Sequence, residues 1–162
     1  MTGIRDPRRD EVEQLARIWH DCWHEAHAHL MPASLTSART LQNFIERLPA
    51  LLEDMRVAGP IGDPVGFCVL RGDELYQLYV DQSARGTGVA RALVSDAEER
   101  LASRGFTTGW LACAIGNTRA ARFYEKCGWH LARNVVIQLQ VPSGSVGVEV
   151  WRYEKSLGDR RA

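Results

Sequence analysis

Hydrophobic residues recur along the chain at two different spacings, and their alternation predicts a mixed α/β protein. Helical spacing is clearest near the start, where three- and four-residue steps produce one apolar stripe: Val12, Leu15, Ile18, Trp19, Cys22 and Trp23. This stripe predicts a helix over 8–30, ended by Met31 and Pro32. A second helix is predicted over 37–48, before Pro49.

Short apolar runs bounded by turn residues predict the first strands. They cover 3–5, 51–58, 65–70 and 74–80, and the segment Arg71-Gly72-Asp73 predicts a hairpin turn between the last two. The strand over 74–80 leads into a glycine-rich turn. A strand followed directly by such a turn is typical of a strand that ends where a helix begins.

The second half repeats the alternation. A four-residue apolar repeat predicts an amphipathic helix over 87–103, and a strand over 107–114 follows it. Asn117 is placed to cap a helix over 118–126, and two long strands over 130–141 and 146–155 complete the chain. The predicted order is β-α-α-β-β-β-α-β-α-β-β, a mixed central sheet of about seven strands with helices on both faces. We expect one domain over 1–156 and a tail over 157–162.

The most specific sequence lies where the 74–80 strand leads into the 87–103 helix. The turn reads Arg85-Gly86-Thr87-Gly88-Val89-Ala90 and is followed by Arg91. A helix N-terminus has backbone N–H groups without intrahelical partners, and its dipole favours negative charge. Glycine lets a ligand approach those groups closely, so the turn predicts a cradle for a pyrophosphate. A dinucleotide fold is disfavoured, because Arg91 occupies the position of its third glycine.

A second block, Asn117-Thr118-Arg119-Ala120-Ala121-Arg122-Phe123-Tyr124-Glu125-Lys126-Cys127-Gly128-Trp129, lies downstream. The two blocks together resemble the paired signatures of the GNAT superfamily of N-acetyltransferases, with Trp129 in place of a usual Phe. The resemblance is strong over 74–129 and weaker elsewhere. It implies the GNAT fold, in which the 74–80 and 107–114 strands splay apart, and it implies acetyl-CoA as the co-substrate.

The resemblance also implies which residues bind acetyl-CoA. The pyrophosphate would lie on the cradle, and the pantetheine arm would pair with the strand edge and contact the second block. The expected acetyl-CoA-binding residues are Leu78, Tyr79, Val80, Arg85, Gly86, Thr87, Gly88, Val89, Ala90, Arg91, Asn117 and Tyr124.

Two residues are candidates for the chemistry. Tyr124 matches the tyrosine that protonates the leaving thiolate in the family, and it lies two helical turns after Asn117 on the same face. Glu74 lies eleven residues before Arg85, the offset of the general base in some histone acetyltransferases; many members instead use water chains. No nucleophile is evident in the sequence, so we expect direct transfer in a ternary complex.

The predicted first helix is rich in histidines. Trp23, His24 and His27 resemble the segment that lines the acceptor pocket in small-molecule GNAT enzymes. The alternatives are a solvated polar face, a histidine base or a metal site, and the metal is disfavoured because no carboxylate or thiol partner is evident. We expect no metal and a small-molecule amine as acceptor.

Composition narrows the class of protein. The 162 residues carry a net charge of zero, which argues weakly against a nucleic-acid or membrane-surface role. No apolar run is long enough to span a bilayer, and the four scattered cysteines are typical of reduced thiols in a cytoplasmic protein. The apolar segment Val135–Val141 suggests a sheet edge that pairs in a homodimer.

Other functions stay open on the sequence alone. A non-catalytic acyl-CoA-binding or sensing module needs the cradle but no base. Acetylation of a protein or peptide amine, and donors such as succinyl- or propionyl-CoA, are also compatible with these residues. A nucleotide-binding regulatory domain is disfavoured by the second block.

Overall fold

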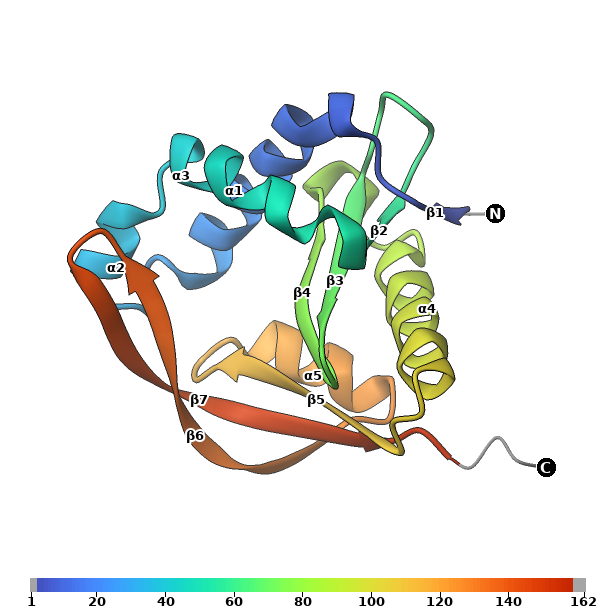
Figure 1. Cartoon of the computed structure of the whole chain (residues 1–162). Coiled ribbons are helices and arrows are strands. Elements are labelled where there is room, and N and C mark those ends of the chain that lie inside the picture. Colours follow the sequence, from blue (N-terminus) through green and yellow to red (C-terminus); the bar gives the residue numbers. More distant parts are fainter. Residues whose placement is uncertain (1–2, 159–162) are drawn as a thin grey trace.

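Seven strands form one mixed sheet in the order β1-β2-β3-β4-β5-β7-β6 (Figure 1). The computed structural model describes residues 3–158. Every neighbouring pair of strands is antiparallel except β4 and β5, which are parallel. The strands are β1 Ile4–Arg5, β2 Met55–Ala58, β3 Gly66–Arg71, β4 Glu74–Val80, β5 Thr108–Ala114, β6 His130–Val141 and β7 Gly144–Ser156. The predicted fold class, a seven-stranded mixed sheet, is confirmed.

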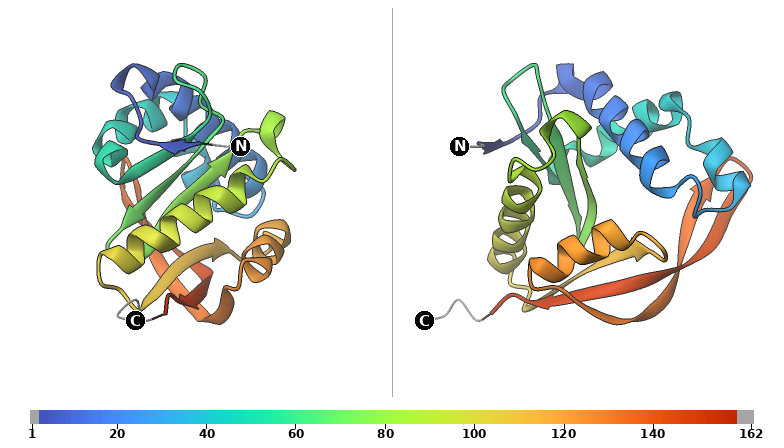
Figure 2. Two further views of the ribbon diagram at one scale, coloured as in Figure 1. Left: turned by 90° about the vertical axis from the view of Figure 1, so that its right-hand side faces the viewer. Right: turned by 180° about the vertical axis from the view of Figure 1, so that it is seen from behind.

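Helices cover both faces of this sheet (Figure 2). They are α1 Val12–His27, α2 Ala33–Ala38, α3 Leu41–Arg47, α4 Val89–Ser103 and α5 Thr118–Lys126, with 3-10 turns η1 Arg9–Glu11, η2 Leu48–Asp54 and η3 Gln82–Ala84. Helices α1 and α3 pack on one face, whereas α4 crosses the other face and α5 lies beside β5. No helix within the described residues is both long and apolar enough to cross a bilayer.

Two predicted elements differ from the structure. The helix predicted over 37–48 is split into α2 and α3, because the Thr40 hydroxyl accepts a hydrogen bond from Asn43 N at 3.1 Å and so starts a new helix. The strand predicted over 51–58 begins only at Met55. Pro49 lies in the first turn of η2, where its fixed φ favours a helical turn over a strand.

Two hydrophobic cores lie on opposite faces of the sheet. The first packs α4 and α5 against the sheet and contains Leu93, Leu101, Leu111 and Trp129. The second packs α1 and α3 against the other face, with Trp19, Phe44 and Phe67 at its centre. The two cores hold β3 and β4 between them, so the position of β4 is fixed from both sides.

The long β6–β7 hairpin curves away from the rest of the sheet and ends beside α2 (Figure 1). Inward residues of β6 pack against the second core, whereas Val136 on the outward side is 64% exposed. β6 is an edge strand, so the homodimer expected from this segment stays a prediction. Leu157, in the expected tail, donates its N–H to Thr107 O at 2.8 Å; residues 159–162 lie outside the described part of the chain.

Trp129 provides a test of the first core. Its side chain is 2% exposed, and its indole Nε1 donates to Glu98 Oε2 at 3.2 Å. Trp129→Ala should lower the free energy of unfolding by about 3–5 kcal/mol, the usual cost of removing a buried large aromatic side chain. Trp129→Phe should cost roughly 1–2 kcal/mol, because it leaves a smaller cavity and one unpaired acceptor. Urea unfolding measures both; equal losses would show that the indole is not packed as described.

Candidate functional site

A gap between β4 and β5 contains the main cavity of the described residues. These parallel strands pair only at Glu74 and Trp110, and the register of β4 against β3 shifts near Tyr76, where β4 carries an extra residue. Beyond that point the strands separate, as the resemblance implies. The cavity has a volume of about 540 Å³ and is lined by Cys22, Ala26, His27, Leu75, Tyr76, Gln77, Leu78, Tyr79, Val80, Ala84, Arg85, Gly86, Gly88, Val89, Ala90, Arg91, Ala112, Cys113, Ala114, Asn117, Arg119, Ala120, Phe123 and Tyr124.

The cradle forms one end of this cavity. Gly86 and Gly88 have φ angles of +76° and +89°, which only glycine adopts without strain, and Gly88 is the N-cap of α4. Among residues 3–158, the backbone N–H groups of Gly86, Thr87 and Gly88 have no acceptor. A Cβ added to either glycine would meet no protein atom within 4 Å. Free donors, open space and a helix N-terminus together fit a pyrophosphate.

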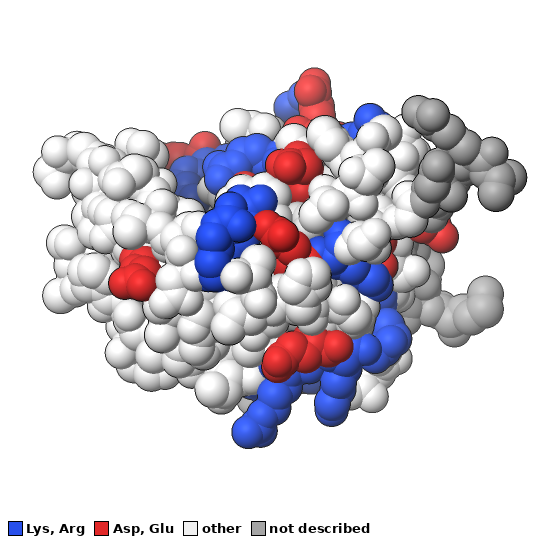
Figure 3. All heavy atoms as spheres, turned by 90° about the horizontal axis from the view of Figure 1, so that it is seen from below, with Lys and Arg blue, Asp and Glu red and all other residues white. Residues whose placement is uncertain are grey.

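The charge of the cavity wall is also suited to an anion. The charged lining residues are Arg85, Arg91 and Arg119, and no Asp or Glu is among them. Glu25 of α1, outside the wall, contacts Arg85 at 2.6 Å and Arg119 at 3.4 Å. The hydrogen bond from Arg85 lowers the pKa of Glu25. Elsewhere acidic and basic side chains are interspersed, as on the underside of the molecule (Figure 3).

β4 presents a free edge to the cavity. Its residues 75–80 pair with β3 on one side, and after Glu74 they have no strand partner on the β5 side. One carbonyl is occupied, since the Cys22 thiol donates to Val80 O at 3.4 Å. The remaining backbone groups can bind an extended ligand by strand addition. Leu78, Tyr79 and Val80 therefore lie where the pantetheine-binding prediction needs them.

Tyr124 and Asn117 lie on the opposite wall. Asn117 Oδ1 caps α5 by accepting from Ala120 N at 3.3 Å. The Tyr124 ring packs beside Phe123 and Trp129, and its hydroxyl forms no hydrogen bond to a described residue. Burial, and next the neighbouring Cys113, raise the pKa of Tyr124. The phenol therefore stays protonated and can donate a proton or a hydrogen bond.

The thiols in the wall are poor nucleophiles. All four cysteines are free and buried. Cys22 and Cys113 line the cavity, whereas Cys68 and Cys127 do not. Burial raises the pKa of Cys113 to about 12 and also raises the pKa of Cys22. Because the thiolate is the reactive form, neither residue is activated to accept an acetyl group.

Of the three predicted acceptor-side residues, only His27 lines the cavity. Burial, and next the charge of His29, lower the pKa of His27 to about 4, so the imidazole is neutral at neutral pH. Trp23 is 8% exposed and belongs to the second core. His24 donates from Nε2 to Arg39 O at 2.5 Å, so it holds the turn between α2 and α3.

The structure separates Glu74, the candidate base, from the other predicted residues. Glu74 lies at the closed end of the gap, where β4 and β5 pair, and is absent from the cavity wall. Its carboxylate accepts from Arg71 Nη2 at 3.1 Å, and burial raises its pKa.

Thr87 is also absent from the wall, because its hydroxyl donates to Ala84 O. No group of metal-ligating residues occurs within the described chain.

Sequence reasoning missed several wall residues. Cys22 and Ala26 lie one helical turn apart on α1, on the apolar stripe that was assigned to the core. Arg119 is the third residue of the second block, and its positive charge could have marked it as a candidate for the cavity wall. Tyr76 was not identified because the irregularity in β4 that places it is not encoded in any local pattern.

Comparisons with known proteins agree with this geometry. Residues 12–129 match the model of the acetyltransferase (GNAT) family. A peptidyl-lysine N-acetyltransferase, YjaB of Salmonella typhimurium, is 29% identical over 136 residues, 80% of this chain and 83% of that protein. The solution structure of apo YjaB from Escherichia coli has a TM-score of 0.73 at 26% identity and covers 95% of this chain and 97% of that one. The structure of yncA from Salmonella typhimurium with its cofactor acetyl-CoA has a TM-score of 0.71 at 14% identity, covering 100% and 97%.

His27 should make stability depend on pH. An imidazole in the unfolded chain has a pKa near ~6.5, well above the folded value. Between about pH 6.5 and the folded pKa of about 4, the unfolded chain binds a proton that the folded chain does not. The stabilising contribution is thus fully present above about pH 6.5 and is lost as the pH falls towards the folded value. His27→Gln should reduce the loss of stability over this range.

Urea unfolding at a series of pH values measures the effect. His130→Gln, which alters an exposed histidine outside the cavity, is the matched control and should retain the wild-type decline. An unchanged decline in His27→Gln would contradict the burial of this imidazole.

Proposed function

The chain belongs to the acetyltransferase (GNAT) family and is an N-acetyltransferase, and we propose that it transfers an acetyl group from acetyl-CoA directly to an amine in a ternary complex. The observation that carries the proposal is the single cavity that joins the cradle, the free edge of β4 and Tyr124. That these three features line one continuous cavity supports the proposal. A non-catalytic sensing module would need the cradle to bind acyl-CoA. It would need neither the Tyr124 phenol nor a space for an acceptor beyond that phenol.

The donor would be held by this chain's own backbone and arginines. The free N–H groups at 86–88 and the first turn of α4 would bind the pyrophosphate, assisted by Arg85 and Arg91. The free edge of β4 would bind the pantetheine arm, with Asn117 on the other wall. Backbone N–H groups at this edge would also polarise the thioester carbonyl. Solved GNAT neighbours that carry acetyl-CoA or coenzyme A support this assignment.

The chemistry would fall to Tyr124 and to water. Attack of a neutral amine on the thioester carbonyl expels the coenzyme A thiolate, and the protonated Tyr124 phenol can supply the proton that this leaving group requires. No carboxylate lines the cavity, so the amine would lose its proton through solvent. The raised pKa values of Cys22 and Cys113 favour direct transfer over an acetyl-cysteine intermediate.

Two classes of acceptor are supported. The predicted class is a small molecule, and the position of Tyr76, Tyr79 and His27 in the wall of a cavity supports it. The second class is a lysine of a protein, which the name of the similar YjaB proteins suggests. A small amine and a lysine-containing peptide should therefore be assayed side by side.

Calorimetry with acetyl-CoA tests the donor site. The wild type should bind acetyl-CoA with micromolar affinity and should not bind NADH. Gly88→Ala should weaken acetyl-CoA binding about tenfold or more, because a Cβ at this positive φ strains the backbone and points into the cradle.

Gly105→Ala is the matched control for backbone strain. Gly105 has a φ of +92° and equally open space around a Cβ, but it follows α4 at the far end from the cradle. It should leave acetyl-CoA affinity unchanged. Absence of acetyl-CoA binding to the wild type would overturn the proposed function.

Tyr124→Phe tests the leaving-group role. Turnover at saturating substrates should fall by roughly 10²-fold, the usual contribution of a positioned acid, while acetyl-CoA affinity stays near the wild-type value. Tyr153→Phe, a buried tyrosine of the same core outside the cavity wall, is the control. Unchanged turnover in Tyr124→Phe would remove this role and leave the donor site standing.

A further inference from the structure

Arg39 is a buried arginine without an anionic partner. The residue is 4% exposed and ends α2 at the turn before α3. Burial lowers its pKa to about 10; the groups close enough to influence it are Arg47, Tyr76 and Tyr79. Within residues 3–158, its guanidinium forms neither an ion pair nor a hydrogen bond with any side chain or carbonyl.

Other sheltered arginines of the chain are paired. Arg5 contacts Glu11 at 2.6 Å, Arg56 contacts Asp6 at 2.6 Å and Arg85 contacts Glu25 at 2.6 Å. A buried charge without a counter-ion is costly, and proteins retain one mainly where a ligand supplies the counter-ion. Arg39 therefore differs from the rest of the structure in a way that favours a binding role.

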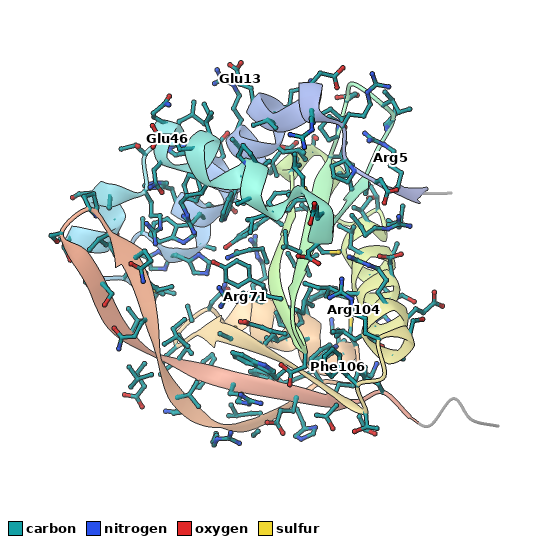
Figure 4. All side chains as sticks on the ribbon, viewed as in Figure 1. Arg5, Glu13, Glu46, Arg71, Arg104 and Phe106 are labelled. Carbon is teal, nitrogen blue, oxygen red and sulfur yellow. The ribbon has the colours of Figure 1, made fainter. Side chains whose placement is uncertain are left out.

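The surroundings of Arg39 reinforce its positive character. Arg47 adds a second cation and stacks over Trp19, with its Cζ 4.6 Å from the ring centroid. The carboxylate nearest in sequence, Glu46, lies exposed on the outer side of α3 and accepts from Gln42 at 3.2 Å (Figure 4). The Glu46 carboxylate therefore does not pair with the Arg39 guanidinium. This end of the molecule thus contains two guanidinium groups with no described carboxylate paired to either.

Arg39 is close to two residues of the cavity wall, although it does not line the cavity itself. Tyr76 and Tyr79 both line that cavity, and neither phenol hydroxyl forms a hydrogen bond to a described residue. Burial raises the pKa of Tyr79, so its hydroxyl remains a donor. Three hydrogen-bond donor groups without acceptors, one of them a cation, therefore lie near one another: the two phenols in the cavity wall and the Arg39 guanidinium outside it.

The position of Arg39 is fixed by its backbone. His24 Nε2 donates to Arg39 O at 2.5 Å, and Arg39 N donates to Leu35 O at 3.2 Å and Thr36 O at 3.3 Å. The histidine belongs to α1, whose next turn contributes His27 to the cavity wall. These contacts fix the backbone of Arg39 before any ligand arrives, and burial of the residue limits the positions open to its side chain, which reduces the entropic cost of binding.

We propose that Arg39 binds a carboxylate of the acceptor, so that the acceptor is a small amino acid-like molecule carrying both an amine and a carboxylate. This inference rests on the proposed acetyl transfer. A guanidinium matches a carboxylate with two parallel hydrogen bonds, and the Tyr76 and Tyr79 phenols add neutral donors. With its carboxylate held at Arg39, the acceptor directs its amine towards the free edge of β4 and Tyr124.

The test compares free L-amino acids with their carboxamides, which keep the amine and lose the negative charge. The wild type should acetylate at least one amino acid with a kcat/KM about tenfold or more above that of its carboxamide. Arg39→Gln should abolish this preference by raising KM for the free acid, and Arg39→Lys should restore part of it. Acetyl-CoA affinity by calorimetry should be unchanged in both variants. Arg9→Gln, an exposed arginine on η1, is the control and should retain the preference.

The outcomes separate the two proposals. Equal rates with acid and carboxamide, or a preference for the acid that Arg39→Gln leaves intact, would overturn the role of Arg39 while acetyl transfer stands. Preference for a lysine peptide, unaffected by Arg39→Gln, would do the same. If no acceptor is acetylated, thermal protection by N-acetyl-L-amino acids decides: protection of the wild type that is lost in Arg39→Gln supports the carboxylate site, and no protection overturns it. Failure to bind acetyl-CoA overturns only the proposed function.

Discussion

The site depends on one constraint, the contact of β4 and β5 at a single residue pair. Glu74 pairs with Trp110, and the Trp110 indole donates to Asp73 Oδ1 at 3.0 Å, so the two strands are held together at one end. Past this pair, parallel strands would normally continue their ladder. Here they separate, which leaves the β5-facing edge of β4 unpaired and opens the cavity. The unpaired edge and the access to Tyr124 both follow from that separation.

The fold tolerates this opening because packing contacts elsewhere stabilise β4 and β5. Packing of α4 and α5 on one face and of α1 and α3 on the other holds β4 between two cores. β5 is in turn fully paired with β7. Several unsatisfied groups gather around the cavity: free N–H groups in the cradle, an unpaired strand edge and free phenols, with the unpaired Arg39 guanidinium near the phenols. Such groups lower stability in the absence of ligand, and their concentration is expected of a site organised in advance of binding.

Much of the fold and of the donor side could be predicted from sequence, because both depend on local signals. The glycine turn, the cap at Asn117 and the apolar repeats of α4 act within a few residues, and they place the cradle and Tyr124 correctly. The acceptor side depends on packing between distant segments. Glu74 matches a sequence offset, yet the paired end of the strands removes it from the cavity. Trp23 and His24 share a helix face with His27, but Trp23 is buried in the second core and His24 is bonded to the Arg39 carbonyl. Arg39 itself has no sequence signal, since its isolation from carboxylates arises only from the tertiary structure.

Helix α1 connects the two ends of the site. Glu25 contacts Arg85 and Arg119 beside the cradle, Cys22 donates to Val80 O on the free strand, and His24 holds the backbone of Arg39. The phosphates of a bound donor would compete with Glu25 for these arginines, because Glu25 is the carboxylate that pairs with both of them. Any displacement of Glu25 would act on the helix that also positions the acceptor end. The order of elements therefore has a physical consequence: the first helix of the chain contacts the donor side and the acceptor side at once, and the geometry of one end constrains the other.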